Sequence, residues 1–568
     1  MDPDGYMRLL RVEQLVENGD WYDQNIHIAN APHGHPLPWS RLIDVVIILM
    51  MFTADIFVSS SEALFVAGVW FSPLMLVVAS LSIVILMRRT SLSEDYLFAL
   101  CILFLTQPGL MNYFAAARPD HHSCLLALAS VHLALLYANL AGNGSTKAFA
   151  LHGILQGISL WASIETITLW VCAAAAYSLG WLNKTTSGKA NFYYHLGVLL
   201  TSLFAILLET PWALTEDMTH DRLNRNYLVL VGSVALSWFL LWQIRHHAPL
   251  ALNGLKSKVF AGIVSMSLCI GMTHLFAGSI WGGPMSAISP ELQSIWLDRI
   301  TEFQPIASTF TELILEGSIW IPSMTIGSIY VVYRIYQLVI NKRFPSNREL
   351  AWAIHAILFT GLIFYQKRWS AYACIIWIVP VAMTATAFLE ITINKCRLRL
   401  VGLLAMFLTA VSPILLSLAL TVSQADSTAQ ISSTASKPDV ASTGYLDWIE
   451  TLPEDAIILA PMDLSPEIMF RTKRKTVGGH YHTNPQGIFD TFRVLGSVSD
   501  DTARKIIDER GIAYILVDTS PTAAAFYQTD SKGITLHNRL SNNQPPDYCM
   551  QVKELGRLIA YKVIHPEN

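Results

Sequence analysis

Long apolar runs separated by short polar turns dominate the first three-quarters of the chain. A run of about 20 residues is long enough to cross the hydrocarbon core of a bilayer as an α-helix. The stretch 41–58 is also apolar, but it follows a loop rich in Pro and His and carries Arg41, Asp44 and Asp55. We interpret it as an interfacial or re-entrant helix. Twelve other runs are predicted to span: 64–87, 95–113, 121–141, 146–164, 165–183, 191–209, 226–244, 257–278, 316–340, 349–366, 369–390 and 399–422.

Basic residues follow every odd-numbered run, which sets the expected orientation. Loops rich in Lys and Arg stay on the cytoplasmic side, so residues 1–40, the loops 114–120 and 279–315, and the chain after 423 are expected outside. The alternative is that 41–58 spans and this orientation is wrong. An outer N-terminal segment must be carried across the bilayer, so a further helix is expected before residue 1. The alternative is translocation of the N-terminus without a prior anchor, which its acidic, weakly basic start permits. The basic exits lie at 88–89, 184–189, 245–258, 342–348 and 395–399.

Composition separates the last quarter of the chain from the rest. Charged residues are roughly twice as frequent in 424–568 as before it. Periodicity in this part predicts a strand at 457–461, a helix at 500–511 and a strand at 513–519. The net charge of −4 argues against a nucleic-acid partner, and the seven Cys have no zinc-ligand spacing. We therefore expect an outer segment 1–63, a transmembrane domain 64–423 and an outer α/β domain 424–568.

Two polar clusters at expected outer helix ends carry metal-ligand chemistry. Asp2 and Asp4 form a D-x-D pair, and paired carboxylates suit a hard divalent cation. The alternative is a helix cap, because Asp favours helix starts. Asp120, His121 and His122 begin the run 121–141. Together they can bind Mn²⁺ or a similar ion, and the alternative is a polar cap with interfacial histidines.

The long outer loop 279–315 contains the sequence WLDRITEFQP at 296–305. Loops of this length are usually functional or disordered. Apolar residues flank Arg299 and Glu302, so the loop has the composition to pack over a site. The alternative is a surface amphipathic helix.

Three further charged residues lie where function is plausible. Lys367 and Arg368 occupy an outer turn, against the positive-inside rule. Since Arg binds phosphate in a bidentate manner, the turn suits a phosphate ligand, and the alternative is contact with lipid headgroups. Asp463 follows the strand predicted at 457–461, where loops often carry function. The alternative there is a plain turn.

Together these motifs resemble the catalytic subunit of the oligosaccharyltransferases, which are GT-C glycosyltransferases. That family has one spanning helix more than the twelve predicted here and an outer C-terminal domain. Asp2 and Arg8 match the spacing of its first acidic motif, whereas Asp4-Gly5-Tyr6 matches the bacterial variant of it. Both Asp residues therefore remain candidates.

The resemblance extends to three later motifs. Asp120 and His122 match the archaeal D-H-H motif. The family's fifth outer loop carries a Glu in a T-I-x-E motif, and R-I-T-E places Glu302 there, with Arg299 in place of Thr. Arg368 is placed like the family's Arg near the lipid pyrophosphate.

The resemblance implies a membrane enzyme that takes a polyprenyl-linked sugar donor at the outer face of the inner (cytoplasmic) membrane. It implies a divalent cation, Mg²⁺ or Mn²⁺, close to a phosphate leaving group. The roles it implies are catalytic for Asp2, Asp4 and Glu302, donor-phosphate binding for Lys367 and Arg368, metal binding for Asp2, Asp4, Asp120 and His122, and acceptor contact for Asp463.

One motif departs from the family. Its W-W-D-Y-G signature, which reads the acceptor sequon Asn-x-Ser/Thr, aligns with Pro461-Met462-Asp463-Leu464-Ser465, and only the Asp is kept. We therefore predict transfer to an acceptor other than a sequon Asn. A genuine N-oligosaccharyltransferase is the first alternative. A transporter or a non-catalytic membrane protein is the second, and would not bring residues 2–8, 120–122, 302 and 368 together.

Overall fold

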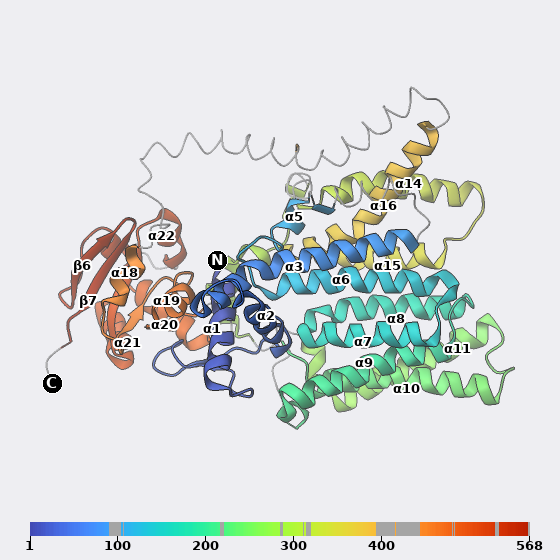
Figure 1. Cartoon of the computed structure of the whole chain (residues 1–568), viewed down its shortest axis with the longest axis horizontal. Helices are drawn as coiled ribbons and strands as arrows, with labels where there is room; N and C mark the ends of the chain where they lie inside the picture. Colours follow the sequence, from blue (N-terminus) through green and yellow to red (C-terminus); the bar gives the residue numbers. More distant parts are fainter. Residues whose placement is uncertain are drawn as a thin grey trace.

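A bundle of long helices lies beside a small α/β unit, with α1 (Pro3–Asn18) and α2 (Arg41–Ala54) between them (Figure 1). Most of the predicted span 95–113 falls outside the described residues. So do all but one residue of the predicted span 399–422 and the whole linker 424–443. The computed structural model describes residues 1–89, 104–105, 107–215, 221–283, 288–309, 312–313, 320–392, 415, 444–479, 481, 483–528 and 533–565.

Each of the other predicted spans contains a helix. Among the described residues, α3, α6, α9, α10 and α11 are long and apolar enough to cross a membrane, so the chain is a multi-pass membrane protein. At 14 residues, α2 is shorter than a span requires. The bundle consists of α3 (Ser60–Arg89), α6 (His121–Ala138), α7 (Thr146–Ala162), α8 (Ile167–Leu182), α9 (Gly188–Glu209), α10 (Arg225–His247), α11 (Leu255–Phe276), α14 (Pro322–Ile340), α15 (Asn347–Leu362) and α16 (Ser370–Thr392).

Glycines bring α7 and α9 into close contact. A Cβ atom on Gly153 would lie 2.0 Å from the backbone oxygen of Tyr194, and one on Gly197 would lie 2.8 Å from that of Ala150. Small residues that let helix backbones approach are the usual means of packing between membrane helices. Short elements connect the helices: α5 (Pro108–Met111), η1 (Asn139–Asn143), η2 (Ile164–Thr166), η3 (Pro211–Leu214), η4 (Gly278–Gly282), α12 (Pro290–Ile295), η6 (Leu297–Arg299), η7 (Thr301–Phe303) and η8 (Lys367–Trp369).

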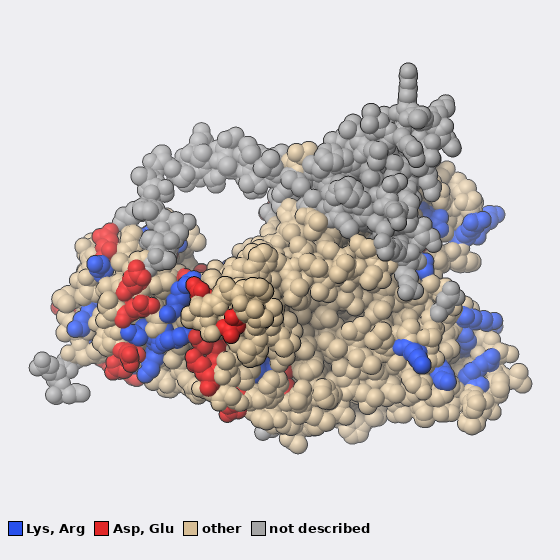
Figure 2. Space-filling view, in the orientation of Figure 1, with Lys and Arg blue, Asp and Glu red and all other residues tan. Residues whose placement is uncertain are grey.

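Charge is unequally distributed between the two ends of the molecule. In the face shown in Figure 2, Lys and Arg without neighbouring Asp or Glu gather at the end of the bundle far from the α/β unit. The sheet end carries both signs of charge in the same view. The basic residues at the end of α10 and the end of α14 belong to the loops predicted to be cytoplasmic.

The C-terminal unit is built on a five-stranded mixed sheet in the order β4-β3-β5-β7-β6. The predicted strands are present as β3 (Ile457–Leu459) and β5 (Ile512–Asp518), and the predicted helix is α21 (Asp500–Arg510), which Gly511 ends with a φ of 65°. The remaining elements are β4 (Lys475–Thr476), β6 (Cys549–Leu555), β7 (Leu558–Val563), α18 (Gly444–Glu450), α19 (Ser465–Thr472), α20 (Pro485–Leu495), α22 (Pro521–Tyr527) and α23 (Leu536–Ser541). A two-stranded ribbon, β1 (Asn25–Ile26) with β2 (His35–Pro36), precedes α2.

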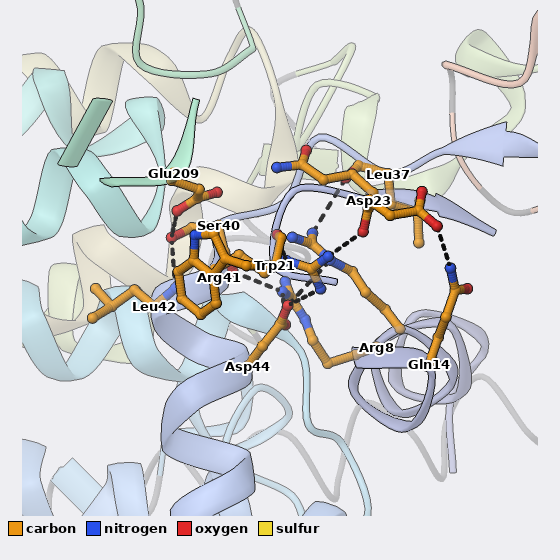
Figure 3. A network of polar contacts seen from close by, with 12 residues as sticks. Arg8, Gln14, Trp21, Asp23, Leu37, Ser40, Arg41, Leu42, Asp44 and Glu209 are labelled. Atoms are coloured by element: carbon orange, nitrogen blue, oxygen red, sulfur yellow. Dashed lines mark hydrogen bonds and ion pairs between the residues drawn. The ribbon is translucent and has the colours of Figure 1, made fainter. Parts of the chain in front are cut away.

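A buried cluster of charges joins α1 to α2 (Figure 3). The Asp44 carboxylate accepts a hydrogen bond of 2.9 Å from Arg8, and lies 3.1 Å from Arg11 Nε and 3.2 Å from Arg41 Nη1. All four side chains are at most 1% exposed. Burial, only partly offset by Asp44, lowers the pKa of Arg11 to about 9. One carboxylate thus fixes three guanidinium groups and, through them, the position of α1.

Candidate metal and phosphate site

The first turn of α1 carries both N-terminal acidic residues. Asp2 is the N-cap, and its Oδ1 accepts a hydrogen bond of 2.9 Å from Gly5 N. Pro3 follows at the first helical position, where its missing N–H costs nothing. Asp2 also pairs with Arg118 at 3.0 Å. Asp4, one residue into the helix, instead lines the cavity described below. The capping alternative therefore applies to Asp2, and Asp4 is the stronger candidate for ligand chemistry.

A group with metal-ligand spacing lies at the start of α6. Asp120, His121 and His122 each offer one ligand atom, and these atoms all lie within 4.8 Å of one another. Asp120 Oδ1 is 2.5 Å from His121 Nδ1, and its Oδ2 is 3.8 Å from His122 Nε2. One carboxylate with two imidazoles fits Mn²⁺ or Zn²⁺ better than Mg²⁺, which prefers oxygen ligands alone.

The two acidic clusters affect each other electrostatically. Burial and the negative charge of Asp120 raise the pKa of Asp2 to about 7, although Arg118 opposes both effects. Asp120 is also buried, but the facing His121, His122 and Arg118 hold the pKa of that carboxyl well below its usual range. Asp120 is therefore ionised, as a metal ligand must be.

Arg368 reaches the same region from η8, after α15. It pairs with Glu165 at 3.6 Å, and its guanidinium carbon lies 4.8 Å from the centre of the Phe303 ring. Lys367 points elsewhere, with its Nζ 4.3 Å from the centre of the Trp320 ring. Of the two predicted phosphate-binding cations, only Arg368 lines the cavity.

A cavity of about 380 Å³ brings these groups together. Its volume falls within the range typical of small-molecule sites. The charged groups and histidines that line it come from α1, α6, η2, η7, η8 and the turn before α10, and are Asp4, His121, His122, Glu165, Asp221, Glu302 and Arg368.

The segment that carries Glu302 is fixed at both sides. It forms the two short turns η6 and η7, which excludes the predicted alternative of an amphipathic helix. Trp296 and Leu297 are buried in the hydrophobic core of the C-terminal unit. On the other side, Gln304 O accepts a hydrogen bond of 2.7 Å from the Lys367 backbone. Glu302 thus faces the cavity from a segment that contacts both parts of the protein.

Asp463 lies apart from this group. It is exposed and does not line the cavity, whereas the neighbouring Met462 is buried in the core of the C-terminal unit. Gly478 lies against this turn, because a Cβ atom there would be 3.4 Å from the Met462 side chain.

Two carboxylates of the cavity, Glu165 and Asp221, were not predicted from the sequence. His121 belongs to the cluster predicted to bind Mn²⁺, although the ligands that the resemblance implies are Asp120 and His122. Glu165 lies in a short break between two apolar runs, and a carboxylate at such a break is a signal that it faces water or a partner.

The sequence matches no protein-family model and no curated protein. Its fold is similar to that of the archaeal oligosaccharyltransferase AglB from Archaeoglobus fulgidus, solved in complex with an inhibitory peptide and a dolichol-phosphate. The TM-score is 0.71 at 14% identity, over 91% of this chain and 66% of that chain. A structure of the Archaeoglobus fulgidus enzyme with Zn and sulfate gives a TM-score of 0.67 at 13% identity, over 99% of this chain and 69% of that one.

The chain spans about two thirds of the length of these archaeal proteins. At this level of identity the likeness concerns the fold. The resemblance drawn from the motifs is confirmed at that level: the fold is similar to that of the archaeal oligosaccharyltransferase, with a multi-pass helical part and a small C-terminal sheet.

Proposed function

We propose that the protein is a membrane glycosyltransferase that moves a sugar or oligosaccharide from a polyprenyl-(pyro)phosphate donor to an acceptor outside the cytoplasm. The observation that carries the proposal is the meeting of the Asp120–His121–His122 group, Arg368 and Glu302 around one cavity. A non-catalytic scaffold has no need of that convergence. A transporter typically places its charged groups near the bilayer midplane, whereas these lie at helix ends.

The cavity suits a leaving group that carries negative charge. Asp120 and His122, with His121 and Asp4 beside them, fit a divalent cation, which would neutralise charge on the departing phosphate. Arg368 supplies a fixed cation from the other side. In the transfer, an acceptor oxygen or nitrogen bonds to the anomeric carbon as the bond from that carbon to the phosphate oxygen breaks.

A carboxylate must orient the acceptor and take its proton. Asp4 and Glu302 line the cavity and are the candidates for this role. Asp2 supports them less directly, since it caps α1 and pairs with Arg118. The polyprenyl phosphate remains as the second product.

The side of the membrane follows from charge. The basic end of the bundle lies far from the α/β unit (Figure 2), and the positive-inside rule makes that end cytoplasmic. We therefore assign the cavity and the C-terminal unit to the outer face of the inner membrane. Cysteine labelling near residues 88 and 342 should detect cytoplasmic positions, and labelling from outside would refute this orientation.

The acceptor is proposed not to be a sequon Asn. In place of two Trp the chain has Pro461 and Met462, and neither offers a side-chain donor. Met462 is buried in the core of the C-terminal unit and so does not offer an apolar surface to a peptide. Asp463 alone gives an incomplete hydroxyl site, and incomplete sites discriminate poorly.

The test is an assay of the full chain in lipid nanodiscs with short polyprenyl-linked sugars and Mn²⁺. We expect metal-dependent release of polyprenyl phosphate with lipid or glycan acceptors, loss of it in Asp120→Asn, and no product with a sequon peptide. Efficient glycosylation of the peptide would establish the N-oligosaccharyltransferase alternative. Failure of all donors, together with an unchanged glycolipid and glycoprotein profile in a deletion strain, would refute the proposal.

A further inference from the structure

A row of buried polar side chains crosses the middle of the helical bundle, away from the cavity. It consists of His132 on α6, His152 on α7, Tyr177 on α8 and His355 on α15, none more than 2% exposed. Ionisable groups inside membrane helices are costly and are commonly retained for a function. The proposed transferase chemistry uses none of these side chains.

Hydrogen bonds connect the row from end to end. His355 Nδ1 lies 2.8 Å from Ala351 O, and His355 Nε2 lies 3.4 Å from His132 Nε2. His132 Nδ1 is then 3.1 Å from His152 Nε2. At the other end, His152 Nδ1 is 2.6 Å from the Tyr177 hydroxyl, which accepts a hydrogen bond of 2.9 Å from Asn139 Nδ2.

The two ends determine the direction of every bond between them. A carbonyl oxygen only accepts, so Nδ1 of His355 carries a proton, and in the neutral ring its Nε2 must accept. His132 therefore donates from Nε2 and accepts at Nδ1, and His152 does the same. The Tyr177 hydroxyl donates to His152 and has its oxygen free to accept from Asn139. Burial in the bundle favours neutral imidazoles, and with neutral rings one arrangement of protons satisfies every contact in the row.

The row lies at one depth below the candidate site, as α6 and α8 show. On α6, His132 follows Asp120 by roughly three helical turns, which corresponds to about 18 Å along the axis at the α-helical rise. Tyr177 follows Glu165 by the same separation, almost all of it within α8. Both helices thus carry a cavity or metal-group residue at the outer end and a member of the row at the same distance below it.

The other two helices agree with this depth. Going towards the site, His355 on α15 precedes Arg368 by a similar stretch of chain, which ends in η8. His152 on α7 likewise precedes Ser163, which lines the cavity. Each of the four helices therefore connects one member of the row to one residue at the outer end of the bundle.

We propose that this row is a register lock: His132, His152, Tyr177 and His355 are positioning residues that fix the axial alignment of the four helices whose outer ends form the candidate site. Sliding one helix by a turn, about 5.4 Å, would break the row and displace Asp120, Glu165 or Arg368 from its partners. A directional row resists this more specifically than apolar packing does, because each member has one donor and one acceptor position to satisfy.

The first test is spectroscopic and does not depend on activity. Nitrogen-15 NMR of the full chain in bilayers, with labelled histidine and assignment by single His→Gln variants, should show the Nδ1–H tautomer for His355. It should show the Nε2–H tautomer for His132 and His152, with all three rings neutral near pH 7. A doubly protonated ring or a reversed tautomer in any of the three would overturn the proposal.

The second test asks whether the row positions the site, and it rests on the proposed metal group. His152→Leu should weaken Mn²⁺ binding, measured by EPR, and lower kcat, each by about 10-fold, while KM for the donor changes little. His152→Gln should restore both, because Gln donates from Nε2 and accepts at Oε1. His195→Leu is the matched control: His195 is equally buried but bonds to Trp170, outside the row.

The outcomes separate the two proposals. Unchanged Mn²⁺ affinity in a folded His152→Leu protein would refute positioning. Failure of Gln to restore affinity that Leu has lost would also refute it. If wild-type protein transfers no sugar, the proposed function fails. The histidine tautomers and the Mn²⁺ affinities of the variants still test whether the row positions the four helices.

Discussion

Replacing Asp44 by Asn tests whether one carboxylate secures α1. The change removes the negative charge of the carboxylate that contacts Arg8, Arg11 and Arg41, all of which stay buried. Removing one partner of a buried ion pair costs about 3–5 kcal/mol. The Asn amide also turns an N–H group towards the guanidiniums, where the carboxylate had only acceptors. We therefore expect a loss of about 3–5 kcal/mol, which favours release of α1 by a factor of roughly 10²–10⁴.

The assay is thermal unfolding and limited proteolysis of the full chain in detergent. In Asp44→Asn, the loop 19–39 should be cleaved far faster than in wild type, and the thermal midpoint should fall by several degrees. Asp55→Asn is the matched control, since Asp55 ends the same helix but is exposed, and such changes usually stay within about 0.5 kcal/mol. Equal cleavage of loop 19–39 in the two variants would refute the reasoning.

Three further predictions concern the site and the C-terminal unit. Asp4→Asn should weaken Mn²⁺ binding, measured by EPR, about 10-fold or more, whereas Asp2→Ala should mainly destabilise the start of α1 by about 1 kcal/mol; the reverse order would restore Asp2 as the ligand. Arg368→Lys should raise KM for the lipid donor about 10-fold in the nanodisc assay, because Lys cannot bind phosphate in a bidentate manner, and an unchanged KM would contradict this role. A hydrogen bond from Arg539 lowers the pKa of Asp500, so this pair stabilises the fold above about pH 4 and loses its effect as pH falls through the lowered pKa. Asp500→Asn should then lower the thermal midpoint by roughly one or two degrees at pH 7 and by less near pH 3, and a difference that grows in acid would contradict it.

The sequence predicted the elements whose signal is local. Apolar runs gave the helices, and a Gly after an amphipathic stretch gave the end of α21 at Gly511. The archaeal-type motif gave Asp120 and His122, which the structure places in one group with His121.

Contacts between distant segments could not be predicted in the same way. Lys367 and Arg368 are adjacent in sequence, but one stacks on Trp320 and the other lines the cavity, because η8 turns their side chains apart. Two partners of Asp44 come from α1, far from it in sequence, and a single polar residue in an apolar run does not reveal them. Glu165 has a role only once Arg368 lies beside it.

The burial of Trp296 and Leu297 in the C-terminal unit ties the cavity to that unit. Glu302 follows shortly after them in the same segment and lines the cavity. A displacement of the C-terminal unit that keeps these two side chains buried therefore also displaces the carboxylate of Glu302. The shape of the cavity and the position of the C-terminal unit are thus mechanically coupled through one short segment.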